Sequence, residues 1–244
     1  MKYLRWILMC SMLSLTGCGG CSDYRNVPSG YAAKLLTPTG FQAKLYTNGQ
    51  VDIGKLGVGG IGNSLVLVEN TSITVKESFL NRHANADKED HRIILQEDNV
   101  PLSVDFRINF MTPDFGHQDS DKLFTLVTPE PWDKDVRMQV IRLEKVYDLM
   151  AKMAVRSVIR DVFDKHGKNY KHAMSSRTDL NNKASAAIIK EIKDSGIPLK
   201  VKAVDLSMLM PDETIWKINA QISSAEAQIQ SMKKLAKEIE SLPN

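Results

Sequence analysis

The clearest periodic run in this chain reads Val100-Pro101-Leu102-Ser103-Val104-Asp105-Phe106-Arg107-Ile108-Asn109-Phe110. Successive side chains of a strand point to opposite faces, so the even-numbered apolar residues would share one face and the polar residues the other. We therefore predict a strand with one buried face and one solvated face that carries Asp105 and Arg107. The buried face requires a second layer. Pro101 lacks an N–H donor, which is tolerated at a strand start.

The segment before this strand predicts further β-structure. Short apolar runs at 31–36, 41–46, 64–69 and 72–76 are separated by turn residues. Asn48-Gly49 stands between two of the strand-like runs, and this dipeptide is a strong hairpin signal. Residues 111–135 are rich in Asp, Pro and Gly, so we predict a surface loop there.

Helical periodicity follows the loop. Apolar residues recur every three or four positions up to about Phe163 at Val140, Leu143, Val146, Tyr147, Met150, Met153, Ala154, Val158 and Ile159. A second helix is predicted from Thr178-Asp179, which can cap its start, to Gly196. It would carry an apolar stripe at Ala184, Ala187, Ile188 and Ile192.

A strand at 199–208 would follow the second helix, with Val201 and Ala203 inward and Val204 as a further candidate. The order of elements predicts an α+β fold in which helices cover one face of an antiparallel sheet.

The C-terminal part, from Pro211 onward, predicts one long helix with a seven-residue repeat. One seam position of the repeat holds Ile215, Ile222, Ile229 and Ala236. The other holds Ile218, Ala225, Met232 and Ile239. Such a seam is typical of helices that pack on other helices. We favour self-association because the stripe reaches close to the chain end; a helix folded back on its own domain is the alternative.

The N-terminus carries an export signal. Lys2 and Arg5 precede a short apolar run from 6 to 15, and Leu15-Thr16-Gly17-Cys18 follows. About ten apolar residues are half of what a spanning helix needs. The four residues resemble the lipobox of bacterial lipoproteins, which implies cleavage after residue 17 and acylation of Cys18, with stable attachment through several acyl chains. There are two alternatives to acylation of Cys18: an ordinary signal that leaves a free cysteine, and modification of Cys21.

The same resemblance implies a location in the bacterial cell envelope. Gly19, and not Asp, follows Cys18, which favours the outer membrane over the inner one, facing the periplasm. Residues 18–26 are small and polar and would form a tether. Only Cys21 then remains as a thiol, so no disulfide within one chain is expected.

Charge excludes one class of partner. The formal net charge of +3 loses two units when Lys2 and Arg5 are cleaved off, so no broad positive field points to nucleic acid.

The element order resembles the SPFH or band 7 family, which includes the stomatins, prohibitins and flotillins, over roughly 27–242. The resemblance is carried by Val27-Pro28-Ser29-Gly30-Tyr31, by the strand 98–108, by Ala154-Val155-Arg156-Ser157-Val158-Ile159, and by Ser195-Gly196-Ile197 before Val201-Lys202-Ala203-Val204-Asp205-Leu206. It implies an SPFH-like domain at 27–209, an oligomerisation helix at 210–244, and a scaffold without enzymatic activity. The chain departs from the family in two ways. Family members usually hold the membrane through an N-terminal helix or hairpin and not through a lipid, and their C-terminal coiled coils are often much longer.

Catalytic, cofactor and metal motifs are not expected in this chain. Gly57-Val58-Gly59-Gly60-Ile61-Gly62 matches a dinucleotide-binding pattern, but a strand-like run follows where that pattern needs a helix. The histidines are His83, His91, His117, His166 and His172, at irregular intervals that fit no zinc site. Ser175-Ser176 lie near His172, but the Gly-x-Ser-x-Gly elbow of a nucleophilic serine is missing there. The charged run 85–92 is expected to be a solvated loop, with a docking patch as the alternative.

The sequence therefore predicts a lipid-anchored homo-oligomer that encloses or regulates membrane proteins, with a protease as the example that the family suggests. A monomeric, lipid-tethered binding module of the periplasm is the second hypothesis, and a lipoprotein hydrolase a weaker third.

Overall fold

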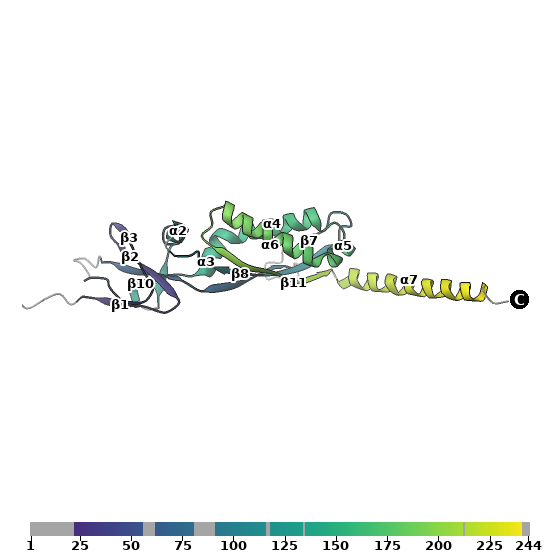
Figure 1. The fold of residues 1–244 in the computed structure, drawn as a ribbon, viewed down its shortest axis with the longest axis horizontal. Helices are drawn as coiled ribbons and strands as arrows, with labels where there is room; N and C mark the ends of the chain where they lie inside the picture. Colours follow the sequence, from purple (N-terminus) through teal and green to yellow (C-terminus); the bar gives the residue numbers. More distant parts are fainter. Residues whose placement is uncertain are drawn as a thin grey trace, which may run out of the picture. The chain divides into compact units, whose positions relative to one another are not determined.

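A computed structural model describes residues 22–55, 62–80, 91–115, 118–133, 135–211 and 213–240. The signal 1–17, Cys18 and Cys21 lie outside these residues, as do most of the glycine run and of the charged run, His83 and His117. Within the described residues the fold is a mixed α+β fold, as predicted. It divides into two compact units (Figure 1).

Unit 1 comprises the described residues up to Ile73, Met111–Ala151 and Gly196–Lys200. A two-stranded sheet pairs β1 (Tyr24–Val27) with β4 (Gly49–Asp52). A five-stranded sheet has the order β3 (Gly40–Tyr46), β2 (Tyr31–Thr37), β5 (Ser64–Glu69), β10 (Asp135–Ile141), β9 (Glu130–Trp132), in which only the β5–β10 pair is parallel. The helical elements are α2 (Gln118–Leu126), α3 (Leu143–Val146) and the π-helical turn η2 (Tyr147–Ala151).

Both sheets of unit 1 contribute to one core. Its buried residues are Val27, Ala33, Leu35, Val51, Ile53, Leu65, Leu67, Met138 and Val140. The rings of Tyr31 and Trp132 meet edge to face beside it, with centroids 5.0 Å apart. The short β1–β4 sheet is thus held to the larger sheet by apolar burial.

Unit 2 comprises Thr74–Phe110, Lys152–Ser195 and the chain from Val201 onward. Its sheet has the order β11 (Lys200–Pro211), β8 (Pro101–Met111), β6 (Ser72–Phe79), and β7 (Ile93–Ile94) also pairs with β8. The helices are α4 (Lys152–His166), α5 (Tyr170–Ser175), α6 (Arg177–Asp194) and α7 (Glu213–Glu240). The helices α4 and α6 lie over one sheet face (Figure 1). The ring of Phe106 on β8 meets that of Phe163 on α4 edge to face.

The predicted central strand is confirmed as β8, with the even-numbered residues 102–110 fully buried. The prediction that Asp105 is solvated is wrong. Asp105 is 5% exposed, and its Oδ2 lies 2.8 Å from the Lys76 Nζ on β6. A cross-strand lysine replaces water as the partner of this carboxylate.

Two predictions about local structure in unit 1 are wrong. Asn48-Gly49 is no hairpin, because β4 pairs with β1 and β3 pairs with β2 through the turn between Thr37 and Gly40. The segment 111–135 is not only loop, because it contains α2 and β9. Leu123 and Phe124 are buried on α2, so tertiary packing outweighs the turn-rich composition.

The helix predicted from Val140 begins only at Leu143, since Val140 belongs to β10. The stripe is also partly wrong: Met153 is 80% exposed, whereas Ala151 and Val155 are buried. The π turn η2 explains the difference, because its wider turn shifts every later residue around the helix axis.

The second predicted helix is confirmed as α6, which begins at Arg177, one residue before Thr178. The short α5 before it was not predicted; Asn169 caps α5 by accepting from the His172 N–H. The last strand is confirmed as β11, but Ala203 is exposed, and the buried residues of β11 are Leu206, Leu209 and Pro211. The predicted tether is too long, because β1 begins at Tyr24.

Candidate self-association site and anchor region

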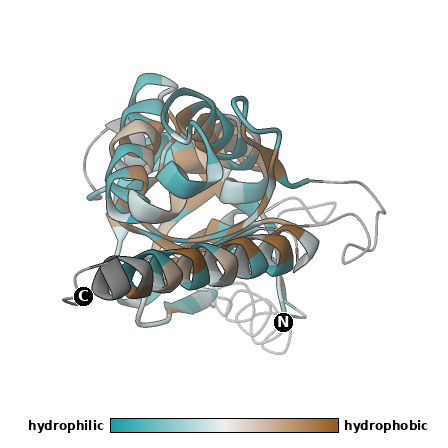
Figure 2. Ribbon diagram, turned by 90° about the vertical axis from the view of Figure 1, so that its right-hand side faces the viewer, coloured by the Kyte–Doolittle hydropathy of each residue, from teal (hydrophilic) through white to brown (hydrophobic). Residues whose placement is uncertain are grey.

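The helix α7 carries the predicted seam with its apolar side chains largely in solvent. It has 28 residues, which at about 1.5 Å per residue gives roughly 42 Å. Ile218, Ile222, Ile229 and Met232 are 50%, 48%, 48% and 60% exposed, and Ala225 is exposed. Brown apolar segments alternate with teal polar ones along α7 in Figure 2. The side chains of Ala236 and Ile239 lie outside the described residues.

Ile215 differs from the rest of the seam. Of the α7 side chains that the structure describes, Ile215 alone is half-buried, and the others are exposed. Full burial of one Ile or Met side chain is worth about 1.5–3 kcal/mol. The seam of an isolated chain therefore leaves much of this free energy unused, and a second helix laid along it would recover it.

The positions that flank the seam are compatible with a second copy of α7. On one side lie Thr214, Gln221, Gln228 and Leu235, all uncharged, and on the other, among the described side chains, lie Glu226 and Lys233. In a parallel pair these two sets face each other, so no two like charges meet across the seam. Charge does not oppose self-association of α7.

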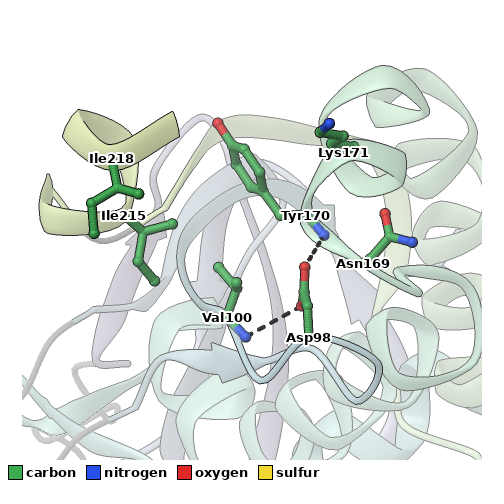
Figure 3. A pocket seen from close by; sticks show the side chains of 7 residues that line it. All are labelled: Asp98, Val100, Asn169, Tyr170, Lys171, Ile215 and Ile218. Atoms are coloured by element: carbon green, nitrogen blue, oxygen red, sulfur yellow. Dashed lines mark hydrogen bonds between the residues drawn. The ribbon is translucent and has the colours of Figure 1, made fainter. Parts of the chain in front are cut away.

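A hollow of about 400 Å³ lies at the base of α7 (Figure 3). Ile215 and Ile218 line it from α7, together with Val100, and the polar residues are Asp98, Asn169, Tyr170 and Lys171. The first turns of the seam thus open onto this hollow. The sequence pattern predicted the two isoleucines as seam residues, but it did not predict the polar residues of the hollow. Among these, only Asn169 has a recognisable local role, as the N-cap of α5.

Hydrogen bonds within unit 2 hold the rim of the hollow. The backbone N–H groups of Tyr170 and Val100 donate to the Asp98 carboxylate at 2.6 and 3.3 Å. Asn169 Nδ2 donates to Glu97 Oε2 at 2.9 Å. The start of α5 is thereby tied to the turn before β8, and the hollow is preformed in the single chain.

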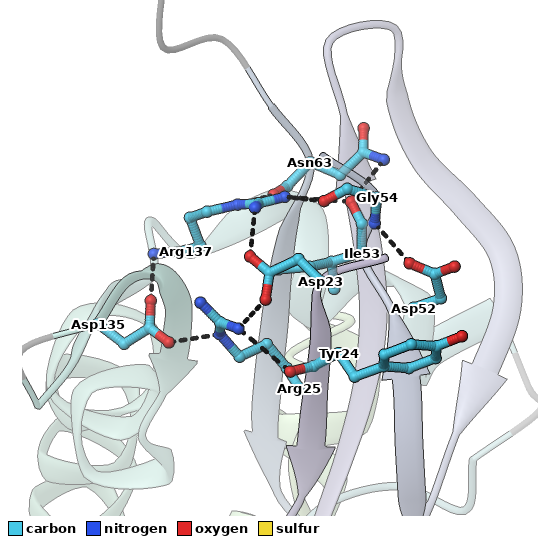
Figure 4. A network of polar contacts seen from close by, with 9 residues as sticks. All are labelled: Asp23, Tyr24, Arg25, Asp52, Ile53, Gly54, Asn63, Asp135 and Arg137. Atoms are coloured by element: carbon cyan, nitrogen blue, oxygen red, sulfur yellow. Dashed lines mark hydrogen bonds and ion pairs between the residues drawn. The ribbon is translucent and has the colours of Figure 1, made fainter. Parts of the chain in front are cut away.

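A polar network fixes the start of the folded chain in unit 1 (Figure 4). Arg137 on β10 is 5% exposed, and its Nη1 donates to Asp23 Oδ2 at 2.6 Å. Its remaining donors reach three backbone carbonyls: Nη2 lies 3.1 Å from the Ile53 oxygen and 2.8 Å from the Gly54 oxygen, and Nε lies 3.1 Å from the Asn63 oxygen. The buried guanidinium is therefore well satisfied.

Arg25 extends this network. Its guanidinium contacts Asp23, and its Nε donates to Asp135 Oδ2 at 2.5 Å. Burial raises the pKa of the Asp135 carboxyl, but hydrogen bonds from the Arg137 N–H and from Arg25 outweigh it, so the net pKa is lowered. The hydrogen bond to Asp135 likewise raises the pKa of Arg25. Sequence reasoning placed residues 23–26 in a tether and missed these ion pairs.

Asp23 follows Cys18 by five positions. Five residues reach at most about 18 Å when fully extended. A lipid on Cys18 would therefore hold unit 1 close to a bilayer.

The described residues give no support to the hydrolase hypothesis. The hydroxyl groups of Ser175 and Ser176 both donate to the backbone carbonyl of His172, at the C-terminal end of α5. Among the described residues no group of three His, Cys, Asp or Glu side chains is arranged to hold a metal ion. No described helix is both long and apolar enough to cross a membrane.

Comparison of the chain with models of known protein families and with curated proteins gives no match.

Proposed function

We propose that this protein is a lipid-anchored, homo-oligomeric scaffold of the bacterial cell envelope, similar in plan to the SPFH or band 7 proteins. The observation that carries the proposal is the exposed seam of α7, in which Ile218, Ile222 and Ile229 are each about half exposed in the single chain. A regular apolar stripe on a long helix is what coiled-coil assembly buries.

Acylation of Cys18 supplies the membrane attachment in this proposal. Each subunit is held by its acyl chains, and neighbouring subunits are joined through α7. The contacts of one subunit with the membrane and with its neighbours are individually modest. Together they hold firmly, because each subunit already bound raises the effective concentration of the next one at its binding site. A ring or cage built in this way encloses a membrane protein, and regulation of a membrane protease is the example that the family resemblance suggests.

A monomeric, lipid-tethered binding module is the second candidate. The hollow of about 400 Å³ at the base of α7 favours it, because that volume is in the range of small-molecule sites. In this alternative α7 stays a single helix and the hollow takes a ligand from the periplasm.

The mass of the detergent-extracted protein distinguishes the two candidates. Light scattering, with electron micrographs of the same peak, should give a mass many times the 27.3 kDa of one chain, and closed particles. Ile222→Asp/Ile229→Asp should reduce the mass toward one subunit, because two charges would have to be buried in the seam.

The matched control is Ser224→Asp/Ser231→Asp, which adds the same two charges with the same spacing to exposed positions of α7 outside the seam and its flanking residues. This control should keep the mass of the wild type. A single-chain mass for the wild type would reject the scaffold and leave the binding module.

A further inference from the structure

We infer that Trp216 of one copy inserts into the hollow at the base of α7 of the next copy, so that subunits join through two different faces. The inference rests on the proposed function and specifies its interface. Trp216 is the knob, and the hole is the hollow lined by Val100, Ile215 and Ile218.

Trp216 is an unusual residue to find in solvent. It is 56% exposed, although Trp is on average highly buried and is enriched among the residues that dominate interface energies. At 3.6 residues per turn, Trp216 points to the side of α7 opposite the seam. A pair of helices joined only through the seam would therefore leave Trp216 in water.

Knob and hole lie at the same level of the helix. Trp216 is one residue from Ile215 and two from Ile218, so both isoleucines lie within about 3 Å of Trp216 along the helix axis. When copies stand side by side and parallel, equal levels face each other. The Trp216 of each subunit then meets the hollow of its neighbour and not some other part of the seam.

The hollow suits an indole in size and chemistry. Its volume of about 400 Å³ is at the lower end of the range that holds drug-sized ligands, which are larger than one indole ring. Val100, Ile215 and Ile218 offer apolar contact. Asp98 carries carboxylate oxygens that accept an indole N–H, and the ammonium of Lys171 is able to lie on the ring face.

This geometry has a consequence for symmetry. A knob on one face and a hole on another make a heterologous contact, which closes into a ring or continues as a filament, whereas a two-fold dimer uses the same patch twice. The contact described here builds a ring of the kind that the scaffold needs.

Cross-linking of the full chain in a Cys21→Ser background tests the inference. Two differently tagged single variants, Trp216→Cys and Val100→Cys, are co-expressed and oxidised, and the tags reveal which chains are joined. We expect mixed 216–100 dimers, few Trp216→Cys homodimers, and a ladder of higher products when both cysteines stand in one chain.

The control replaces Val100→Cys by Ile189→Cys, whose native side chain is 48% exposed on α6. It should give at least tenfold less mixed dimer. Homodimers of Trp216→Cys alone, or absence of the 216–100 product from a protein of high mass, would overturn the inference and leave the scaffold standing. A single-chain mass for the uncross-linked wild type would reject the scaffold and the inference together.

Discussion

Arg137 Nη1 and Asp23 Oδ2 lie 2.6 Å apart although 114 residues separate them in the sequence. Asp23 is among the first described residues, and Arg137 stands on β10 in the five-stranded sheet. The same guanidinium binds the carbonyls of Ile53 and Gly54 after β4. One buried side chain thus ties both strands of the small β1–β4 sheet to the larger sheet.

Replacement of this arginine is the most direct test of the network. Arg137→Gln should lower the free energy of unfolding by about 2–4 kcal/mol, because a carboxylate and three carbonyls lose charged donors. Denaturant unfolding measures the change. Arg142→Gln removes an exposed arginine from the same unit and should stay within about 0.5 kcal/mol. Equal effects of the two variants would contradict the role assigned to Arg137.

The Asp135 carboxylate should make stability depend on acid pH. Its pKa is lowered in the folded protein, so the stabilisation is present above the unfolded value of about 3.9 and is lost as pH falls through the folded value. Asp135→Asn should lower the melting temperature at pH 7, and the difference from the wild type should shrink below pH 4. A difference that stays constant from pH 7 to pH 3 would show that the charge of Asp135 does not stabilise the fold.

The ion pair of Arg156 and Glu77 is the corresponding polar contact in unit 2. Arg156 Nη1 lies 2.6 Å from Glu77 Oε2, the Glu77 side chain is 3% exposed, and the guanidinium lies 4.6 Å from the Phe79 ring centroid. Arg156→Met should cost about 3 kcal/mol, because the buried carboxylate loses its guanidinium.

Two further variants separate charge from packing at this site. Glu77→Gln added to Arg156→Met should recover at least half of the loss, because a neutral amide costs less to bury than a carboxylate. Arg160→Met is the matched control: Arg160 is exposed and lies 5.5 Å from the same ring. A double variant no more stable than Arg156→Met would mean that lost packing, not charge, causes the effect.

Secondary structure could be predicted from the sequence wherever the spacing of apolar residues stays regular over a whole element. The strict alternation of 100–110 predicts β8 to within one residue, and the apolar spacing of α6 and α7 predicts both helices. These patterns are local, since a side chain's face follows from its position in the repeat. The positions of the seam residues on α7 were predictable for the same reason.

The missed features depend on partners far away in the chain. The burial of Asp105 requires Lys76 from another strand, and the network of Asp23 requires Arg137. The change of stripe after Tyr147 comes from one π turn, which leaves no periodic signal of its own. Likewise, the hollow at the base of α7 exists only where three separate segments meet.

Lipidation of Cys18 is the prediction on which the location of the protein depends. In bacteria fed labelled palmitate, the wild-type chain should carry label and sediment with membranes, because several acyl chains give stable attachment where one gives only marginal binding. Cys18→Ser should lose the label and the membrane attachment. Cys21→Ser, three residues further on, should keep both and serves as the control. If Cys21→Ser lost the label and Cys18→Ser kept it, the acylated residue would be Cys21, and the lipid would lie only two residues from Asp23 and the Arg137 network.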